Sequence, residues 1–445
     1  MNDKQSLILE LKNSQQKIVD LTNTLTDAQL SLPYHKGANP PLWEIGHSAF
    51  FFELFILNAL DNADMYDPAM NPVWDSFNID HEDRWNPGVI PSKESTLKYI
   101  DTTYKTILAR IEENELSQQD LYLYKYSIFH QNMHVESLIW SRQTYGYKKM
   151  NFNPGENESI PTGTELSSLG DAEIPAGRYL IGMPADSKNF ATDDFAFDNE
   201  KPRFEVELDS FKISKTLVSN REFLEFIKDG GYKKEALWSW GGQKWLKKEH
   251  NFAPSPEKQM LRPQHPVHWK QENGQWLERY FDQWQVINPD YPVMHVSFFE
   301  AEAFCNWADR RLPTEFEWEV AALGNKKGQD FKKFPWGNTM DAGKVDMDGI
   351  YVAHVPVTAY ENGESAFGCR QMIGTAWEWT SSQYLPYDGF KIDMYSFMST
   401  LQFGYHKVTK GGSCATSSIL TRGTYRQAYL PNRTDVFVGF RTCAK

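Results

Sequence analysis

The chain has 445 residues, of which 40% are hydrophobic, 24% charged and 14% aromatic, and its formal net charge is −13. This length allows two or three domains with cores of their own. The negative charge and the absence of a basic stripe exclude a phosphate-rich partner, so we expect no nucleic acid. No apolar stretch reaches about 18 residues and no signal peptide is recognisable, so we expect no membrane span.

Cysteine usage indicates the compartment. Cys305, Cys369, Cys414 and Cys443 are widely scattered, and no two of them form a CxxC pair. This pattern is typical of a reducing cytoplasm and argues against both a disulfide framework and a thiolate metal cluster. We therefore expect a cytoplasmic protein with free, buried thiols.

Residues 1–150 are predicted to be helical. Apolar residues recur at spacings of three and four in residues 7–25, 40–60, 94–111 and 121–140. Pro40 and Pro41 stand where the second of these helices would begin, which suits proline in a first turn. Four such segments predict an all-α, antiparallel four-helix bundle, with a long connection near residues 62–92.

The pattern changes after this bundle. Residues 151–172 are rich in Gly, Pro, Ser and Glu, which is typical of a linker. From residue 173 to residue 445 short strands and turns dominate, as in residues 176–183, 204–214 and 435–443. Helical patterns in residues 219–230 and 297–311 interrupt them. We therefore predict an α+β domain over residues 173–445.

Three histidines in the predicted bundle are candidate metal ligands. His130 and His134 are four residues apart and share one helix face, while His47 points inward from the second helix. The pair alone fits either hydrogen-bonded core histidines or metal ligands, and a third inward histidine favours ligands. Three neutral imidazoles suit Fe, Zn, Ni or Cu and leave coordination positions open. Gln131 replaces the acid of an HExxH motif, which argues against a metalloprotease.

Several segments of both predicted domains resemble known families. PPLWEIGH and HQNMHVE resemble a DinB-type bundle. IPAGRYLIGM, PVMHVSFFEAEAFCNWADRRLPTEFEWEVAA, GTAWEWTSS and KGGSCAT resemble the formylglycine-generating, or sulfatase-modifying-factor, domain, whose fold is related to C-type lectins. Both domains in this order resemble the nonheme iron sulfoxide synthases of ergothioneine biosynthesis (EgtB-like) and their relatives in ovothiol and selenoneine biosynthesis.

The resemblance implies an activity and its residues. It implies an Fe(II) ion held by His47, His130 and His134, and an oxygen-dependent oxidoreductase that joins the sulfur of a thiol to the imidazole of hercynine, the betaine of histidine. The expected partners are therefore small molecules: hercynine, a donor and O2. The resemblance also implies Tyr384 as the proton donor and Tyr387 as a pocket residue. From the residues alone, two surface tyrosines of a proline-containing loop are the favoured interpretation, because loop tyrosines are common.

Several positions depart from the family members that use γ-glutamylcysteine. Arg84 is retained from their RxxRG pattern, but Pro87 replaces the second arginine. Ala428 and Tyr429 stand in the segment where those enzymes bind the thiol substrate, and Met133 replaces a glutamine that binds the betaine carboxylate. A charged group without a partner in a closed pocket is costly, so these losses argue against γ-glutamylcysteine. Arg84 is either a carboxylate-binding residue or part of an ordinary surface ion pair.

Four alternatives remain for the function. Free cysteine or a less charged sulfur or selenium donor fits the departures. NPPLWEIGH, HEDRW and the methionine before His134 are closer to the selenoneine synthases, which use a selenosugar. A DinB-type thiol S-transferase with Zn or Ni is a second enzyme class. A lectin-like binding protein without catalysis is the third class. Formylglycine-type cysteine oxidation is not expected, because Thr416 and Thr421 occupy the places of its cysteine pair.

Overall fold

The structure is a computed structural model that describes residues 3–150, 152, 160–164, 169–187, 195–248, 262–352, 354–395 and 399–445. The chain forms two compact units, one of residues 1–141 with 186–195 and the other of residues 142–185 with 196–445. The expected linker, residues 151–172, lies largely outside the described residues, and its last two residues belong to strand β1 (Asp171–Ile174).

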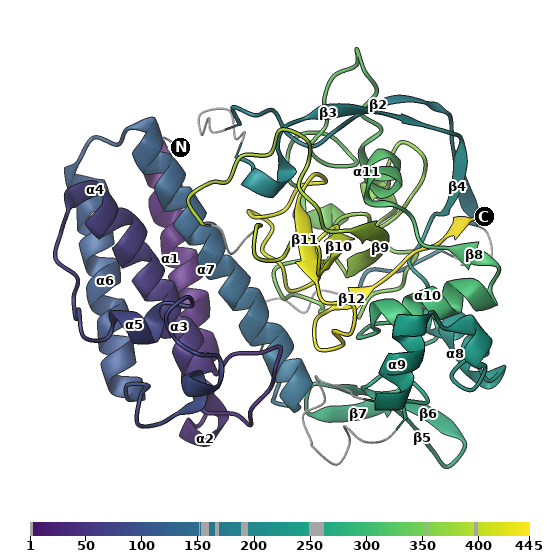
Figure 1. Cartoon of the computed structure of the whole chain (residues 1–445), viewed down its shortest axis with the longest axis horizontal. Helices are drawn as coiled ribbons and strands as arrows, with labels where there is room; N and C mark the ends of the chain where they lie inside the picture. Colours follow the sequence, from purple (N-terminus) through teal and green to yellow (C-terminus); the bar gives the residue numbers. More distant parts are fainter. Residues whose placement is uncertain are drawn as a thin grey trace. The chain divides into compact units, whose positions relative to one another are not determined.

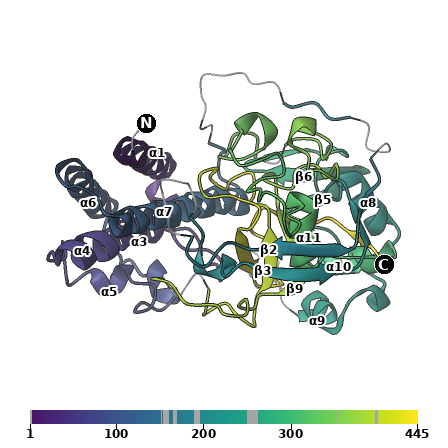
Figure 2. The same cartoon turned by 90° about the horizontal axis from the view of Figure 1, so that it is seen from above.

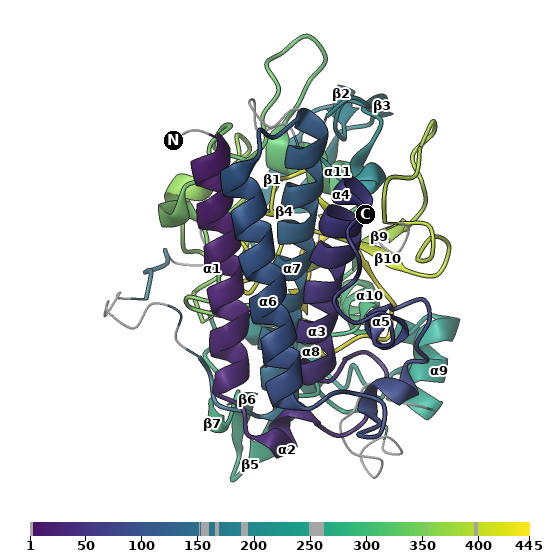
Figure 3. The same cartoon turned by 90° about the vertical axis from the view of Figure 1, so that its left-hand side faces the viewer.

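Helices build the first unit, and its long helices lie side by side (Figures 1 and 3). They are α1 (Asp3–Asn23), α3 (Pro41–Phe52), α6 (Lys93–Glu113) and α7 (Gln118–Tyr145), and the short helices are α2 (Asp27–Leu30), α4 (Ala59–Asp61) and α5 (Asn71–Trp74). The long helices occupy the four ranges that the apolar spacing predicts, so the helical bundle is confirmed.

Helix α3 is the most deeply buried element of this unit. It starts at Pro41, as predicted, and every residue except Leu42 is buried. Its polar residues must therefore find partners inside the protein. The predicted helix over residues 40–60 is not regular throughout, because a π-helical turn covers Glu53–Asn58. The carboxylate of Glu53 accepts a hydrogen bond from the Tyr99 hydroxyl at 2.5 Å, which fastens the start of this turn to α6.

Sheets and short helices build the second unit. One four-stranded sheet has the order β1–β4–β13–β8 and another has the order β11–β10–β9–β12, and there are also a two-stranded antiparallel β2–β3 sheet (Figure 2) and a β5–β6–β7 sheet. The strand bounds are β2 (Gly177–Ile181), β3 (Phe204–Leu208), β4 (Phe211–Ser214), β5 (Trp269–Glu272), β6 (Gln275–Tyr280), β7 (Gln283–Val286), β8 (Arg310–Arg311), β9 (Trp377–Gln383), β10 (Lys407–Lys410), β11 (Arg426–Tyr429), β12 (Val438–Gly439) and β13 (Cys443–Ala444).

Local sequence signals explain where the helices of this unit begin. They are α8 (Asn220–Lys228), α9 (Trp240–Lys248), α10 (Phe298–Trp307) and α11 (Glu315–Leu323). A Ser or Thr followed three residues later by Glu precedes α8, α10 and α11, and both reciprocal hydrogen bonds of a capping box form at each. The mixture of these helices with the sheets confirms the predicted α+β class.

The core of the second unit contains many aromatic side chains. Trp318, Trp377 and Trp379 are fully buried, in keeping with the high aromatic content of this part of the chain. All four cysteines are buried free thiols, as predicted. Among the described helices, none combines the length and the apolar character that crossing a membrane requires.

Candidate metal centre

Two aromatic residues, Trp74 and Trp43, fix the orientation of the His47 ring, which projects from α3. Its Nδ1 lies 2.6 Å from the carbonyl oxygen of Trp74. Because a carbonyl can only accept, Nδ1 carries the proton and Nε2 keeps its lone pair. Trp43, one turn earlier on α3, stacks on the imidazole with ring centroids 4.7 Å apart and 9° between the planes. These contacts set both the tautomer and the plane of the ring.

A glycine makes the Trp74 contact possible. A β-carbon at Gly46 would collide with the six-membered ring of Trp74. The indole therefore packs directly against the backbone of α3, one residue before His47. Where a neighbouring side chain approaches the backbone this closely, only glycine fits.

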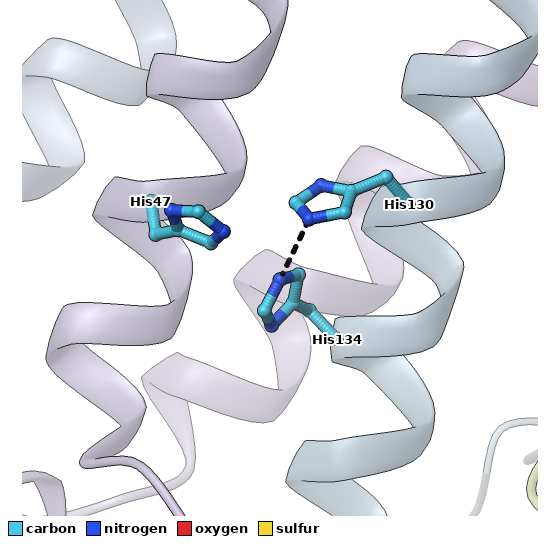
Figure 4. A group of neighbouring side chains, drawn as sticks. All are labelled: His47, His130 and His134. Atoms are coloured by element: carbon cyan, nitrogen blue, oxygen red, sulfur yellow. Dashed lines mark hydrogen bonds between the residues drawn. The ribbon is translucent and has the colours of Figure 1, made fainter. Parts of the chain in front are cut away.

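His130 and His134 reach the same place from α7. The four-residue spacing puts both rings on one helix face, and their Nε2 atoms are 3.3 Å apart. His130 is buried, and its ring stacks on Phe51 with centroids 3.9 Å apart. Figure 4 shows the three imidazoles pointing toward one another, His47 from one helix and the pair from another.

The three histidines form a compact donor set. One nitrogen from each lies within 4.8 Å of the others. Burial, followed by the neighbouring His134, lowers the pKa of both His47 and His130 well below the ordinary value. These two rings are therefore neutral at pH 7, which is the form that binds a metal ion. The arrangement fits a divalent transition-metal ion with three protein ligands and open positions for other molecules.

Two residues that the sequence analysis missed support these histidines. Trp74 supplies the carbonyl for His47, and Glu44 places a carboxylate oxygen 3.6 Å from Nδ1 of His134. Glu44 could have been found, because it precedes His47 by three residues and so shares its face of α3. Trp74 lies in the aperiodic connection between helices, where no pattern singles it out.

Arg84 and Met133 belong to the same unit. Arg84 lies in the 3₁₀ turn Glu82–Trp85 and is buried, so the surface-ion-pair alternative is wrong. Its guanidinium lies 4.0 Å from the centre of the Trp43 ring, and Nη1 donates to the Asn39 amide oxygen at 2.7 Å. Met133 is partly exposed and directly precedes His134 on α7. Substrate binding by either residue stays a prediction.

Tyr384 and Tyr387 lie in the second unit, just after β9. Both are buried, which excludes the alternative of two surface tyrosines. The Asn199 amide donates to the Tyr384 hydroxyl at 2.7 Å, and the Tyr387 hydroxyl donates to Glu315 at 3.4 Å. The Arg426 guanidinium lies 4.9 Å and 4.1 Å from the centres of the two rings. Burial raises the pKa of Tyr384, so its phenol is protonated at pH 7.

Ala428 and Tyr429 are neighbours on β11 with different surroundings. Ala428 is buried in an apolar cluster with Tyr384 and Val408. Its methyl group offers no charge to a substrate. Tyr429 is partly exposed, and its ring contacts Trp379 edge-on with centroids 6.4 Å apart. The structure thus groups the three histidines with Arg84 and Met133 in one unit, and the two tyrosines with this strand in the other.

Family comparisons agree with the two units. The DinB superfamily matches residues 10–138, and the sulfatase-modifying factor enzyme 1-like domain matches residues 162–445. The chain is 30% identical to the hercynine oxygenase of Mycolicibacterium smegmatis, over 98% of each chain. It is 28% identical to the hercynine oxygenase of Mycobacterium tuberculosis, over 99% of each chain. It is also 29% identical to the formylglycine-generating enzyme of Thermomonospora curvata, over 62% of this chain and 93% of that protein.

These findings define a class of protein in which a DinB-type helical bundle precedes a sulfatase-modifying-factor domain. The formylglycine-generating enzymes match only the second part, whereas the hercynine oxygenases match from end to end. The chain therefore belongs to the hercynine oxygenase family.

Proposed function

We propose that the protein is an oxygen-dependent nonheme Fe(II) enzyme that joins the sulfur or selenium of a small donor to the imidazole of hercynine. The observation that carries this proposal is the meeting of His47, His130 and His134, with one nitrogen from each within 4.8 Å of the others, in a chain of the hercynine oxygenase family. Iron bound there would activate O2 and bring the reactants together.

The reaction balances with a thiol donor as follows. The donor loses its S–H hydrogen and hercynine loses the hydrogen of one ring carbon, while a C–S bond forms. One atom of O2 is added to the sulfur, which becomes a sulfoxide, and the other leaves as water with the two hydrogens. The chain must therefore supply and control protons.

Tyr384 is the residue that we assign to this proton transfer. Its phenol is protonated because it is buried, and Asn199 and Arg426 fix its position. The ring of Tyr387 packs against the same guanidinium, 4.1 Å from its centre. A positioned acid of this kind contributes about 10²–10⁴-fold to a rate.

The donor that we propose carries less charge than γ-glutamylcysteine. Ala428 is packed among apolar side chains, and Pro87 offers no charge where the second arginine of the RxxRG pattern would be. A donor with two carboxylates and an amine would leave charges unpaired at these positions. A selenosugar, as in the selenoneine branch, or free cysteine avoids most of this cost.

Oxygen uptake tests the proposal. The protein is purified without oxygen, loaded with Fe(II), and given hercynine with cysteine, γ-glutamylcysteine, a thiosugar or a selenosugar, and products are identified by mass spectrometry. Uptake with a hercynine adduct supports the proposal, and the donor that reacts fastest identifies the branch.

Two outcomes of this experiment contradict the proposal. Transfer to a thiol without oxygen uptake, with Zn or Ni in place of iron, would instead indicate an S-transferase. Failure of the protein to bind any metal at the three histidines, combined with sugar binding, would indicate a lectin-like binding protein.

A further inference from the structure

Glu44 and His134 face each other with complementary atoms. Oε2 of Glu44 and Nδ1 of His134 are 3.6 Å apart. Both atoms are buried, and neither has a hydrogen-bond partner among the described residues. Leaving a buried donor and a buried acceptor unpaired is costly, so a small rotation of the imidazole that joins them would be favourable. Such a rotation makes Nδ1 the donor and leaves Nε2 for other contacts.

The carboxylate of Glu44 is itself fixed from two sides. Its Oε1 accepts a hydrogen bond from the Ser137 hydroxyl at 2.6 Å, and the Asn39 amide donates to the same oxygen at 3.4 Å. Ser137 lies on α7 three residues after His134, so it holds the carboxylate near the same helix face. With Oε1 engaged in this way, Oε2 is the oxygen that remains directed at His134.

The same contacts continue to a second histidine. Asn39 accepts from Arg84 Nη1 at 2.7 Å, and the Arg84 guanidinium covers the face of Trp43. Trp43 in turn stacks on His47, and its indole N–H donates to the carbonyl oxygen of Val73 at 2.7 Å. A connected set of side chains, Glu44, Asn39, Arg84 and Trp43, therefore links His134 to His47.

We propose that Glu44 is a positioning residue that fixes the tautomer and the ring orientation of His134, and that Asn39 and Arg84 link it to the stack on His47. This inference rests on the proposed function, in which the three histidines hold a metal ion. Carboxylates that accept from the second nitrogen of a metal-binding histidine change metal affinity by about 10–100-fold when they are removed. We expect that loss in Glu44→Ala.

Metal affinity, measured without turnover, tests this inference. The affinity of the full chain for Co(II) is measured by competition with a chelator, and the visible absorption of bound Co(II) reports the ligand geometry. Glu44→Ala should weaken Co(II) binding about 10–100-fold and change the absorption band. Ser137→Ala should weaken it less, because Glu44 is then less firmly held but still present.

A matched control is available at the start of the π-helical turn that follows α3. Glu53 is also a buried carboxylate that accepts a tyrosine hydroxyl, and among the described contacts its carboxylate reaches Tyr66 and Tyr99 but none of the three histidines. Glu53→Gln should therefore bind Co(II) within threefold of the wild type. Circular dichroism identifies any variant that fails to fold. If Glu44→Ala is one of them, Glu44→Gln decides the question by the same two measurements.

Each result has a definite meaning. Unchanged affinity and an unchanged Co(II) spectrum in a folded Glu44 variant would overturn the positioning role and leave the proposed function intact. If the wild type binds no Co(II), or if His47→Ala binds it equally well, the metal centre itself fails and the inference fails with it. Weaker binding in Glu44→Ala but not in Glu53→Gln supports the inference.

Discussion

Arg426 determines the environment of the two candidate tyrosines. It is fully buried, pairs with Glu315 through Nε and Nη2 at 2.8 Å and 3.1 Å, and lies against the rings of Tyr384 and Tyr387. A buried charge of this kind is tolerated only because its partner and its hydrogen bonds are complete. The phenol of Tyr384 is thereby held in one place while burial keeps it protonated.

Removing the Tyr384 hydroxyl should affect chemistry more than binding. We expect Tyr384→Phe to lower kcat for the hercynine reaction by about 10²-fold or more, because a positioned proton donor is lost. Tyr387→Phe is the matched control, since its hydroxyl makes only a 3.4 Å contact with Glu315, and we expect a small change in kcat. Steady-state kinetics with the best donor at saturating concentration measures both kcat values. Turnover of Tyr384→Phe within threefold of the wild type would contradict the assignment.

The β5–β6–β7 sheet contains a carboxyl group whose surroundings disfavour its charged form. Glu278 on β6 is half-buried, and removal from water raises its pKa to about 7, although Gln285 donates to it at 3.0 Å. His354 lies 3.6 Å away, and burial lowers the pKa of that imidazole to about 3, so it provides no positive charge at neutral pH. The sheet therefore carries a carboxyl group that is more stable protonated.

This carboxyl group makes the stability of the sheet depend on pH. The unfolded chain releases the Glu278 proton near pH 4 and the folded chain near pH 7, so the folded state binds more protons between these values. The Glu278 contribution to the free energy of unfolding therefore falls as pH rises from about 4 to 7.

Glu278→Gln removes that dependence while it keeps an oxygen for Gln285. We expect its stability relative to the wild type to rise between pH 5 and 7, by up to about 3 kcal/mol, and to level off above pH 7. Urea unfolding at several pH values measures the difference. Glu272→Gln, at an exposed carboxylate on β5, is the control. A difference that does not change with pH would contradict the prediction.

The whole protein has four free thiols and no disulfide. Every cysteine is buried, and burial raises the pKa of Cys305, Cys369 and Cys443. The thiolate is the reactive form, so both access and ionisation oppose reaction in the folded protein. A thiol reagent at pH 8 should therefore label less than one cysteine per folded chain and all four in guanidinium chloride. Rapid labelling of the folded protein would show that a thiol is accessible.

Sequence periodicity explains why much of the bundle could be predicted. Turns of 3.6 residues place His130 and His134 on one face and turn His47 inward, so the helices and the inward direction of these rings follow from local spacing. The contacts of Trp74 and Asn39 depend on an aperiodic connection that has no such signal. The burial of Tyr384 depends on Arg426, which is 42 positions away, and on Asn199, which is 185 away. Contacts between residues so far apart along the chain cannot be predicted from one sequence.

The close contact between Gly46 and Trp74 limits how this sequence can diverge. Any side chain at position 46 would push Trp74 away from α3, and the carbonyl of that residue is the partner of His47. A substitution at position 46 would thus disturb the metal centre indirectly, through Trp74 and His47, although Gly46 itself is not a ligand. In a library with all residues at position 46, we expect only glycine to survive selection for activity, whereas position 42, the one residue of α3 that is not buried, should accept more residues.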